Sequence, residues 1–316
     1  MTTKTMPNRA ANGFRHDAVF YAGMDDFAVC MTSFIRDSLA AGEPILVVVQ
    51  PEKIDLLRSR LDGDAGRVLF QDMAEIGRNP SRIIPVWRDY VAQRGGHTRV
   101  RGIGEPIWAE RTAEELVESQ RHESLLNLAF AGESAWIACP YDTEALDPAV
   151  IEEAFRSHPF VVSGGATLES PAYPGVVGIP TLFDEPLAEP QGPVDRMIVD
   201  LTELGDVRRF VRRQAVVFGL SAQRSADLVL AVNEVAGNTV RHSGGLGTLR
   251  VWSEGDSIVC EVRDGGLIDD PLVGRARPGQ AQEGGIGLWL VNQLCDLVQV
   301  RTSDRGSVVR LHMSRG

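Results

Sequence analysis

A glutamate and an asparagine stand four residues apart in the segment 221–242, at Glu234 and Asn238. Residues at this spacing share one face of a helix. The apolar positions of the segment recur at helical spacing after Ser221, a residue type that favours the start of a helix. A carboxamide oxygen suits Mg²⁺, which prefers oxygen ligands and usually keeps several waters. The pair therefore predicts either a site for water and Mg²⁺ or a solvated helix face.

Two glycine-containing turns follow this helix. Asp264 and Gly266 end a predicted β-hairpin, where a carboxylate can accept a hydrogen bond from an adenine amino group and a glycine lets the backbone approach the ring. Gly285, Gly287 and Leu288 lie where a glycine-rich turn leads into an apolar helix, whose first backbone N–H groups attract phosphate. Each motif alone is equally compatible with a structural turn.

The order of the three motifs resembles the N, G1 and G2 boxes of the GHKL ATPases, over about residues 196–312. The resemblance implies an α+β sandwich, the Bergerat fold, which binds ATP together with Mg²⁺. By that resemblance Asn238 holds Mg²⁺, Asp264 reads adenine, and Glu234 orients or deprotonates the nucleophile. The residues that the resemblance places around ATP are Asn238, Asp264, Gly266, Gly285, Gly287 and Leu288.

The first glycine box departs from the family pattern Asp-x-Gly-x-Gly, because Ile268 stands where the second glycine is expected. The departure concerns catalysis more than ATP binding. It leaves open a non-catalytic adaptor that binds ATP and sequesters a sigma or anti-anti-sigma factor. The polar segment 267–283 between the two boxes is predicted to form a lid over the site.

The strand and helix predicted before the N box resemble the opening of the anti-sigma-factor serine kinases. In that family the γ-phosphate of ATP goes to a Ser or Thr of a small anti-anti-sigma (STAS) partner. The resemblance implies a serine/threonine kinase with a sigma factor and a STAS protein as partners, and related kinase domains form homodimers. A sensor histidine kinase is disfavoured because the preceding stretch has no phospho-accepting histidine, and His158 lacks a heptad context.

Apolar strands alternate with helices from His16 to about residue 163, which predicts an α/β domain with a mostly parallel sheet and helices on both faces. The segments 20–52, 101–108 and 121–130 resemble the MEDS sensory domain, which looks like a RecA-type fold. A phosphate-binding loop of the Gly-x-x-x-x-Gly-Lys type is missing. Four residues either line a sensory ligand pocket or form a buried salt-bridge and capping network: Arg101, Glu105, Glu123 and Asn127.

These patterns divide the chain into four parts. They are a flexible start over 1–15, a MEDS-like sensory domain over 16–163, a Pro/Gly-rich linker over 164–193 and a GHKL ATP-binding domain over 194–316. A sensor joined to a kinase suggests a switch in which a signal at the first domain changes nucleotide or partner binding at the second.

Composition narrows the class of protein. The net charge is −11 over 316 residues, which argues against a nucleic-acid binder but leaves room for a basic patch that serves a protein partner. The sequence has neither an apolar run of about 20 residues, as a membrane span needs, nor an apolar signal-peptide core. We therefore expect a soluble, cytoplasmic protein that acts in signal transduction and transcription regulation.

The four cysteines are predicted to be buried, reduced core thiols, since all lie in apolar contexts and none forms a Cys-x-x-Cys pair. They are Cys30, Cys139, Cys260 and Cys295. Along the sequence, His and Cys do not cluster at metal-ligand spacings.

Overall fold

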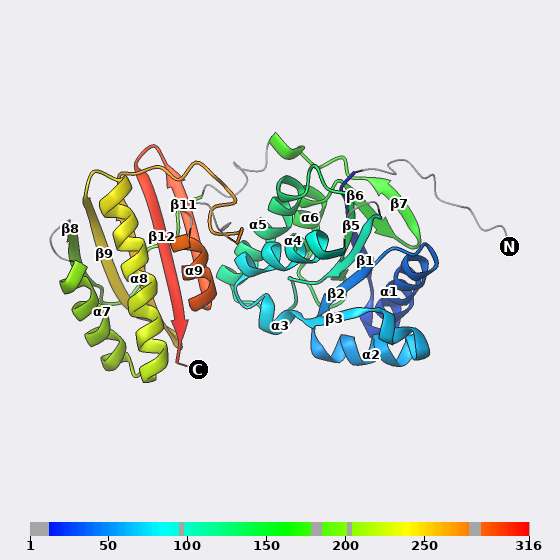
Figure 1. Cartoon of the computed structure of the whole chain (residues 1–316), viewed down its shortest axis with the longest axis horizontal. Coiled ribbons are helices and arrows are strands. Elements are labelled where there is room, and N and C mark those ends of the chain that lie inside the picture. The colour runs from blue at the N-terminus through cyan, green and yellow to red at the C-terminus, as the bar shows by residue number, and fades with distance from the viewer. Residues whose placement is uncertain (1–12, 95–97, 178–184, 201–203, 278–285, 316) are drawn as a thin grey trace. The chain divides into compact units, whose positions relative to one another are not determined.

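Figure 1 shows the computed structural model of the chain, which describes residues 13–94, 98–177, 185–200, 204–277 and 286–315. The chain divides into two compact units, residues 1–76 with 86–179, and residues 77–85 with 180–316. Among the described residues, none of the helices combines the length and the apolar character that a bilayer-spanning helix requires.

The first unit contains a seven-stranded sheet in the order β3-β2-β4-β5-β1-β6-β7. Its strands are β1 (Arg15–Tyr21), β2 (Ile45–Val49), β3 (Leu69–Asp72), β4 (Val100–Gly104), β5 (Ala135–Asp142), β6 (Phe160–Ser163) and β7 (Ala166–Glu169). All neighbours pair in parallel except β6 and β7. The predicted, mostly parallel α/β sheet is confirmed, and β2 shows its physical cause: every residue of this apolar run is buried, since both faces of the sheet are covered.

Helices cover both faces of this sheet (Figure 1). They are α1 (Gly23–Ala40), α2 (Pro51–Leu61), α3 (Met73–Ile76), α4 (Ile83–Arg94), α5 (Ala113–Ala129) and α6 (Pro148–Ser157), with a short 3₁₀ turn at Asp62–Arg67. A second 3₁₀ turn, Pro80–Arg82, belongs to the second unit. Phe27 of α1 and Leu57 of α2 pack in one core with Val19 and Val47 of the sheet. Trp87 of α4 packs against β4, where a Cβ atom on Gly102 would lie 2.5 Å from the Trp87 ring.

The second unit is a five-stranded antiparallel sheet in the order β11-β12-β10-β9-β8, with helices packed on one face. Its elements are β8 (Asp195–Asp200), α7 (Leu204–Phe218), α8 (Ala222–His242), β9 (Leu246–Glu254), β10 (Ser257–Asp264), α9 (Ile286–Leu294), β11 (Leu297–Ser303) and β12 (Gly306–Ser314). Val211 of α7, Val232 of α8 and Val291 of α9 are fully buried in one core with Leu249 and Leu311 of the sheet. The arrangement is the two-layer sandwich expected of a GHKL fold.

The stretch predicted as a linker, 164–193, contributes to both units. It contains β7, which pairs with β6 in the first sheet. Near its other end, Glu189 accepts hydrogen bonds from Arg250 and Arg263 of the second sheet. Residues 178–184 of this stretch lie outside the described part of the chain.

Candidate functional sites

A cavity of about 290 Å³ opens in the second unit between α8, the end of β10 and the start of α9. The residues that line it are Val235, Asn238, His242, Ser243, Asp264, Gly266, Leu267, Ile268, Asp269, Asp270, Val273, Gly287, Leu288, Ser307 and Val309. Residues from all three sequence motifs therefore meet at one hollow, although the motifs are tens of residues apart along the chain.

Helix α8 presents Asn238 at this cavity, with Glu234 one turn earlier, because its other side is held in the core. The side chain of Ser221 caps the helix by accepting a hydrogen bond from the backbone N–H of Arg224 at 3.3 Å. Asn238 Oδ1 accepts a hydrogen bond from Arg241 Nη2 at 2.8 Å. A Cβ atom on Gly287 would lie 3.3 Å from both Asn238 Nδ2 and Glu234 Oε2, so the start of α9 comes close to the polar pair.

Asp264 is held rigidly at the end of β10. Its Oδ2 accepts a hydrogen bond from Thr239 Oγ1 at 2.6 Å, and its Oδ1 accepts one from the backbone N–H of Gly266 at 2.8 Å. A Cβ atom on Gly266 would lie 2.2 Å from Ser243 Oγ, so the Ser243 side chain would have to turn away from a larger residue here. Each carboxylate oxygen keeps a further lone pair with which to accept a hydrogen bond from a ligand.

The cavity brings together five of the residues predicted for ATP: Asn238, Asp264, Gly266, Gly287 and Leu288. Glu234 lies beside Gly287, as described above. Gly285 and part of the predicted lid, residues 278–283, lie outside the described residues. Ile268, which replaces the expected glycine, lines the cavity and packs against the core.

Two neighbours of Asp264 carried no sequence signal. Thr239 lies one turn of α8 beyond Val235 and holds the carboxylate. Ser307, on β12, donates a hydrogen bond through its Oγ to the backbone oxygen of Gly266 at 2.8 Å. Both are single residues outside any box, and only the pairing of β10 with β12 brings Ser307 to Asp264.

The four residues predicted for a sensory pocket in the first unit contact different partners. Arg101 pairs with Glu43 and stacks over the Trp136 ring, with its guanidinium carbon 4.6 Å from the ring centroid. Glu105 accepts hydrogen bonds from Tyr21 and Lys53. Glu123 and Asn127 both face His16.

Glu105 belongs to a buried triad at the carboxyl ends of β1 and β4. Its Oε1 accepts hydrogen bonds from Tyr21 Oη at 2.8 Å and from Lys53 Nζ at 2.5 Å. Burial raises the pKa of Glu105, while the charge of Lys53 lowers it. The buried position of Lys53, at the start of α2, was not predicted, because a lone lysine in a helix is usually exposed to solvent.

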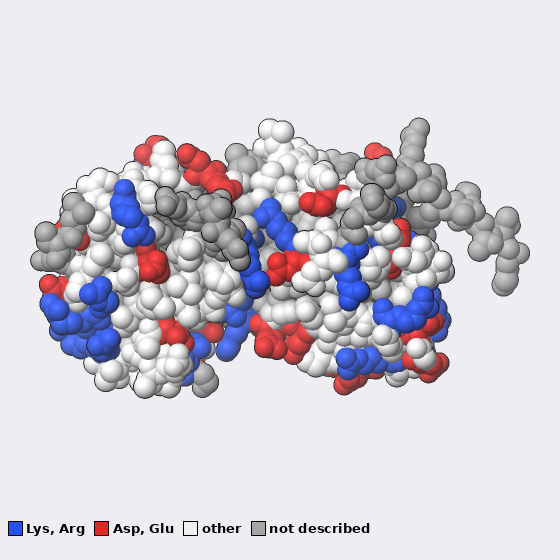
Figure 2. Space-filling view, in the orientation of Figure 1, with Lys and Arg blue, Asp and Glu red and all other residues white. Residues whose placement is uncertain are grey.

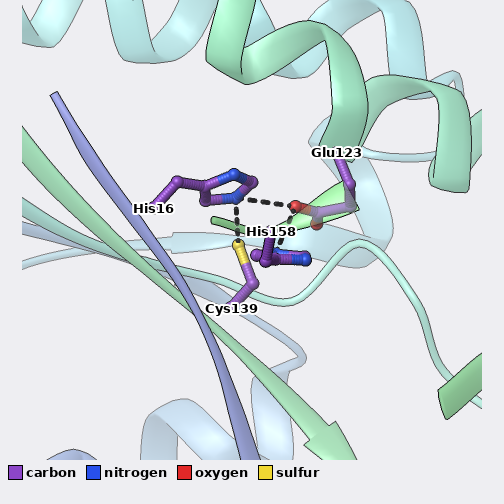
Figure 3. Close-up of side chains that lie close together, drawn as sticks. All are labelled: His16, Glu123, Cys139 and His158. Atoms are coloured by element: carbon purple, nitrogen blue, oxygen red, sulfur yellow. Dashed lines mark hydrogen bonds and ion pairs between the residues drawn. The ribbon is translucent and has the colours of Figure 1, made fainter. Parts of the chain in front are cut away.

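Figure 3 shows Glu123 and three further side chains of the first unit, which point toward one another. His16 comes from β1, Glu123 from α5 and Cys139 from β5, while His158 follows α6. The ligand-type atoms of all four lie within 4.8 Å of one another. No side chain among them is more than 1% exposed.

The shortest separations in this cluster centre on Glu123 Oε2 and His16 Nε2. Glu123 Oε2 lies 3.0 Å from His16 Nε2 and 3.2 Å from His158 Nε2. Cys139 Sγ lies 3.2 Å from His16 Nε2. Spacing along the sequence did not indicate this cluster, because parallel pairing of β1 with β5 brings together residues that are far apart in sequence.

Burial sets the protonation of these groups. It lowers the pKa of His16, and the nearby His158 lowers it further. It raises the pKa of the Cys139 thiol well above its usual value. Burial alone also raises the pKa of Glu123, but hydrogen bonds from His158 and His16 outweigh it and hold that pKa below the usual value.

The surface of the second unit carries a basic patch, despite the negative net charge. Figure 2 shows Lys and Arg side chains gathered over α7 on the visible face. Four exposed arginines belong to this helix: Arg208, Arg209, Arg212 and Arg213. Val216 and Val217 of the same helix are exposed as well, at 66% and 78%.

Comparisons with known proteins agree with the division into two units. Residues 15–159 match the model of the MEDS family, described as the MEthanogen/methylotroph, DcmR Sensory domain. Residues 198–313 match the histidine kinase-like ATPase domain. No curated protein matches the chain.

Among solved structures, the chain is similar to the RsbU and RsbW domains of Rv1364c from Mycobacterium tuberculosis. The identity is 18% and the TM-score 0.30, over 39% of this chain and 32% of that one. A similarity of this extent says nothing about function, and this chain spans less than a third of the other's length. The two family matches show that the chain carries a MEDS sensory domain followed by a histidine kinase-like ATPase domain.

Proposed function

We propose that the chain is a cytoplasmic regulator that binds Mg-ATP in its second unit and acts as an anti-sigma-factor-type serine/threonine kinase, controlled by its MEDS domain. The observation that carries the proposal is the cavity of about 290 Å³, where Asn238, Asp264 and Gly287 meet from three elements. The family match over 198–313 supports nucleotide binding at this place.

The residues around the cavity fit ATP and Mg²⁺. The fixed carboxylate of Asp264 suits the adenine amino group, which is a hydrogen-bond donor. Asn238 Oδ1 already accepts a hydrogen bond from the cationic Arg241. Mg²⁺ would replace that contact, and Arg241 would then be free to bind a phosphate. Gly287 lets the first turn of α9 approach, where backbone N–H groups attract phosphate.

Phosphoryl transfer at such a site depends on positioning and on neutralising negative charge. In the proposed reaction the hydroxyl oxygen of a partner Ser or Thr attacks the γ-phosphorus, and ADP leaves. The proton of the hydroxyl passes to Glu234, which stands one helical turn before Asn238 and serves as general base or orienting group. Mg²⁺ supplies charge neutralisation on the phosphates.

The proposed partners are a sigma factor and a STAS-type anti-anti-sigma protein, and a homodimer of the kinase domain is part of the proposal. The basic patch on α7 supports a partner with an acidic surface, since four exposed arginines lie there beside two exposed valines. Charge complementarity of this kind speeds association and selects among partners.

The proposal is tested by phosphotransfer from γ-labelled ATP. The full chain, Mg²⁺ and a panel of STAS proteins are mixed, and label is expected on a Ser or Thr of one of them. Glu234→Gln should keep ATP affinity and lower the transfer rate by about 100-fold or more. Gln223→Ala is the matched control, because Gln223 lies at the start of the same helix and pairs with Asp227.

Two outcomes would contradict the kinase. Tight ATP binding without transfer to any STAS protein indicates the non-catalytic adaptor, which the presence of Ile268 in the cavity favours. Acid-labile label on the chain itself indicates a histidine kinase. His158, the last histidine before the second unit, is fully buried and therefore a poor acceptor for a phosphoryl group.

A further inference from the structure

The buried cluster of His16, Glu123, Cys139 and His158 has the arrangement of a closed metal site (Figure 3). We propose that the first unit binds one divalent transition-metal ion of the zinc type through His16 Nε2, His158 Nε2, the Glu123 carboxylate and Cys139 Sγ. The site is independent of the proposed kinase function and lies in the sensory domain.

The hydrogen bonds around His16 fix which of its nitrogens faces the cluster. Asn127 Nδ2 donates to the backbone oxygen of Ser157 at 2.7 Å, so the amide oxygen of Asn127 faces the imidazole. That oxygen lies 3.2 Å from His16 Nδ1 and can only accept. A neutral His16 with its hydrogen on Nδ1 directs the lone pair of Nε2 into the cluster, which is the tautomer that a metal ion requires.

His158 is oriented in the same way. Its Nδ1 lies 2.9 Å from the backbone oxygen of Ala154, which can only accept a hydrogen bond. In neutral His158 with its hydrogen on Nδ1, the lone pair of Nε2 is directed toward the cluster, where Nε2 lies 3.2 Å from Glu123 Oε2. Outer hydrogen bonds from ring N–H to a carbonyl are the usual means by which proteins orient metal-binding histidines.

Three acceptors thus converge with one donor among them. Two imidazole nitrogens and a carboxylate oxygen face one another, and the thiol of Cys139 can donate its single hydrogen to only one of them. Glu123 Oε1 is also buried and has no hydrogen-bond partner among the described residues. Either a proton on an imidazole or a metal ion at the centre removes the repulsion between these acceptors, and the metal ion can bind all four groups at once. A divalent ion with one carboxylate and one thiolate gives a net charge of zero, which suits a site without water.

The dimensions and the ligand types select the ion. Bond lengths to Zn²⁺ of about 2.0 Å for nitrogen or oxygen and about 2.3 Å for sulfur give tetrahedral edges of about 3.3 to 3.6 Å. The three shortest separations, 3.0, 3.2 and 3.2 Å, are a few tenths of an ångström shorter than these edges, and all pairs lie within 4.8 Å. Small rotations of the side chains, some outward and some inward, would therefore admit the ion. Two nitrogens, a sulfur and an oxygen favour zinc over Mg²⁺ or Ca²⁺, which prefer oxygen.

The test uses the tag-free full chain. Metal analysis after dialysis should give one zinc per chain, and zinc should raise the melting temperature of the protein, while a chelator should lower it. Replacement by Co²⁺ should give the visible spectrum of a tetrahedral site with a thiolate charge-transfer band. Cys139→Ser should remove that band and weaken Co²⁺ binding by at least about tenfold. Cys30→Ser, a half-buried thiol of the same unit, is the matched control.

The wild-type measurements decide the matter even if Cys139→Ser does not fold. Protein that binds no stoichiometric metal, or whose melting temperature is the same with zinc and with chelator, overturns the proposal and leaves a network that holds only protons. A cobalt spectrum without a thiolate band in the wild type overturns it too, as does one that Cys139→Ser leaves unchanged.

Discussion

The same local motif, Glu-x-x-x-Asn, occurs in both units and has a different role in each. On α5 it is formed by Glu123 and Asn127, which are 0% and 3% exposed. On α8 it is formed by Glu234 and Asn238, which are half-buried. In both places the four-residue spacing puts the two side chains on one face of the helix. The spacing is identical, but the surroundings of the two pairs are not.

What lies opposite the helix face decides what each pair can do. The α5 pair faces the sheet and is closed off by His16 and by the backbone oxygen of Ser157. The α8 pair faces the start of α9, where Gly287 has no side chain to fill the space. One pair is therefore bound into a core network, while the other is left accessible to a ligand.

The largest expected effect comes from removing the carboxylate of the α5 pair. Glu123→Ala should lower the free energy of unfolding of the first unit by about 3–5 kcal/mol, because it leaves the buried groups around it uncompensated. Glu234→Ala should cost less than about 1 kcal/mol, since its side chain is half-buried. Hydrogen exchange of the β1 and β5 amides reports the stability of the first unit, and exchange of the α8 amides reports that of the second. Equal losses from the two variants would contradict the comparison.

This difference also marks what a sequence can predict. The buried apolar strands, the capped helices and the three ATP-site motifs follow from residues close together in the chain, so they were predicted. His16 and Glu123 are 107 residues apart, and His16 and Cys139 are 123 apart. Each is a lone residue in an apolar strand or a helix, where its neighbours give no signal. Only strand order and register bring them together.

Substitution in the α8 pair is expected to change the affinity for Mg-ATP. Asn238→Ala should weaken Mg-ATP binding by roughly 100-fold, because it removes both the proposed Mg²⁺ ligand and the side chain that faces the phosphates. Calorimetry with Mg-ATP and with ATP plus chelator measures the change. The thermal unfolding of the second unit should shift little. Unchanged affinity would mean that the ATP site is misplaced.

Substitution of the asparagine of the α5 pair should instead lower the stability of the first unit. Asn127→Ala leaves His16 Nδ1 and the backbone oxygen of Ser157 without their partner, which should cost the first unit about 2 kcal/mol. Asn127→Asp is a sharper companion, since it keeps an acceptor for His16 but loses the donor to Ser157. Chemical denaturation followed by the fluorescence of the tryptophans checks both. A variant as stable as the wild type would show that this asparagine, like Asn238, is free for another role.

The smallest effect is expected at Glu189, a carboxylate that is held by two arginines but remains 62% exposed. Hydrogen bonds from Arg250 and Arg263 lower its pKa from 4.5 to about 2. Because the folded pKa is the lower one, the stabilisation is fully present above the ordinary value and is lost as the pH falls through about 2.

Solvent screening limits this stabilisation to about 0.5 kcal/mol, so the Glu189→Gln variant should be slightly less stable than the wild type at pH 7. Melting curves of the two proteins should converge between about pH 4.5 and pH 2. A loss as large as that of Glu123→Ala would show that charge pairing, and not burial, sets the cost of removing a carboxylate in this protein.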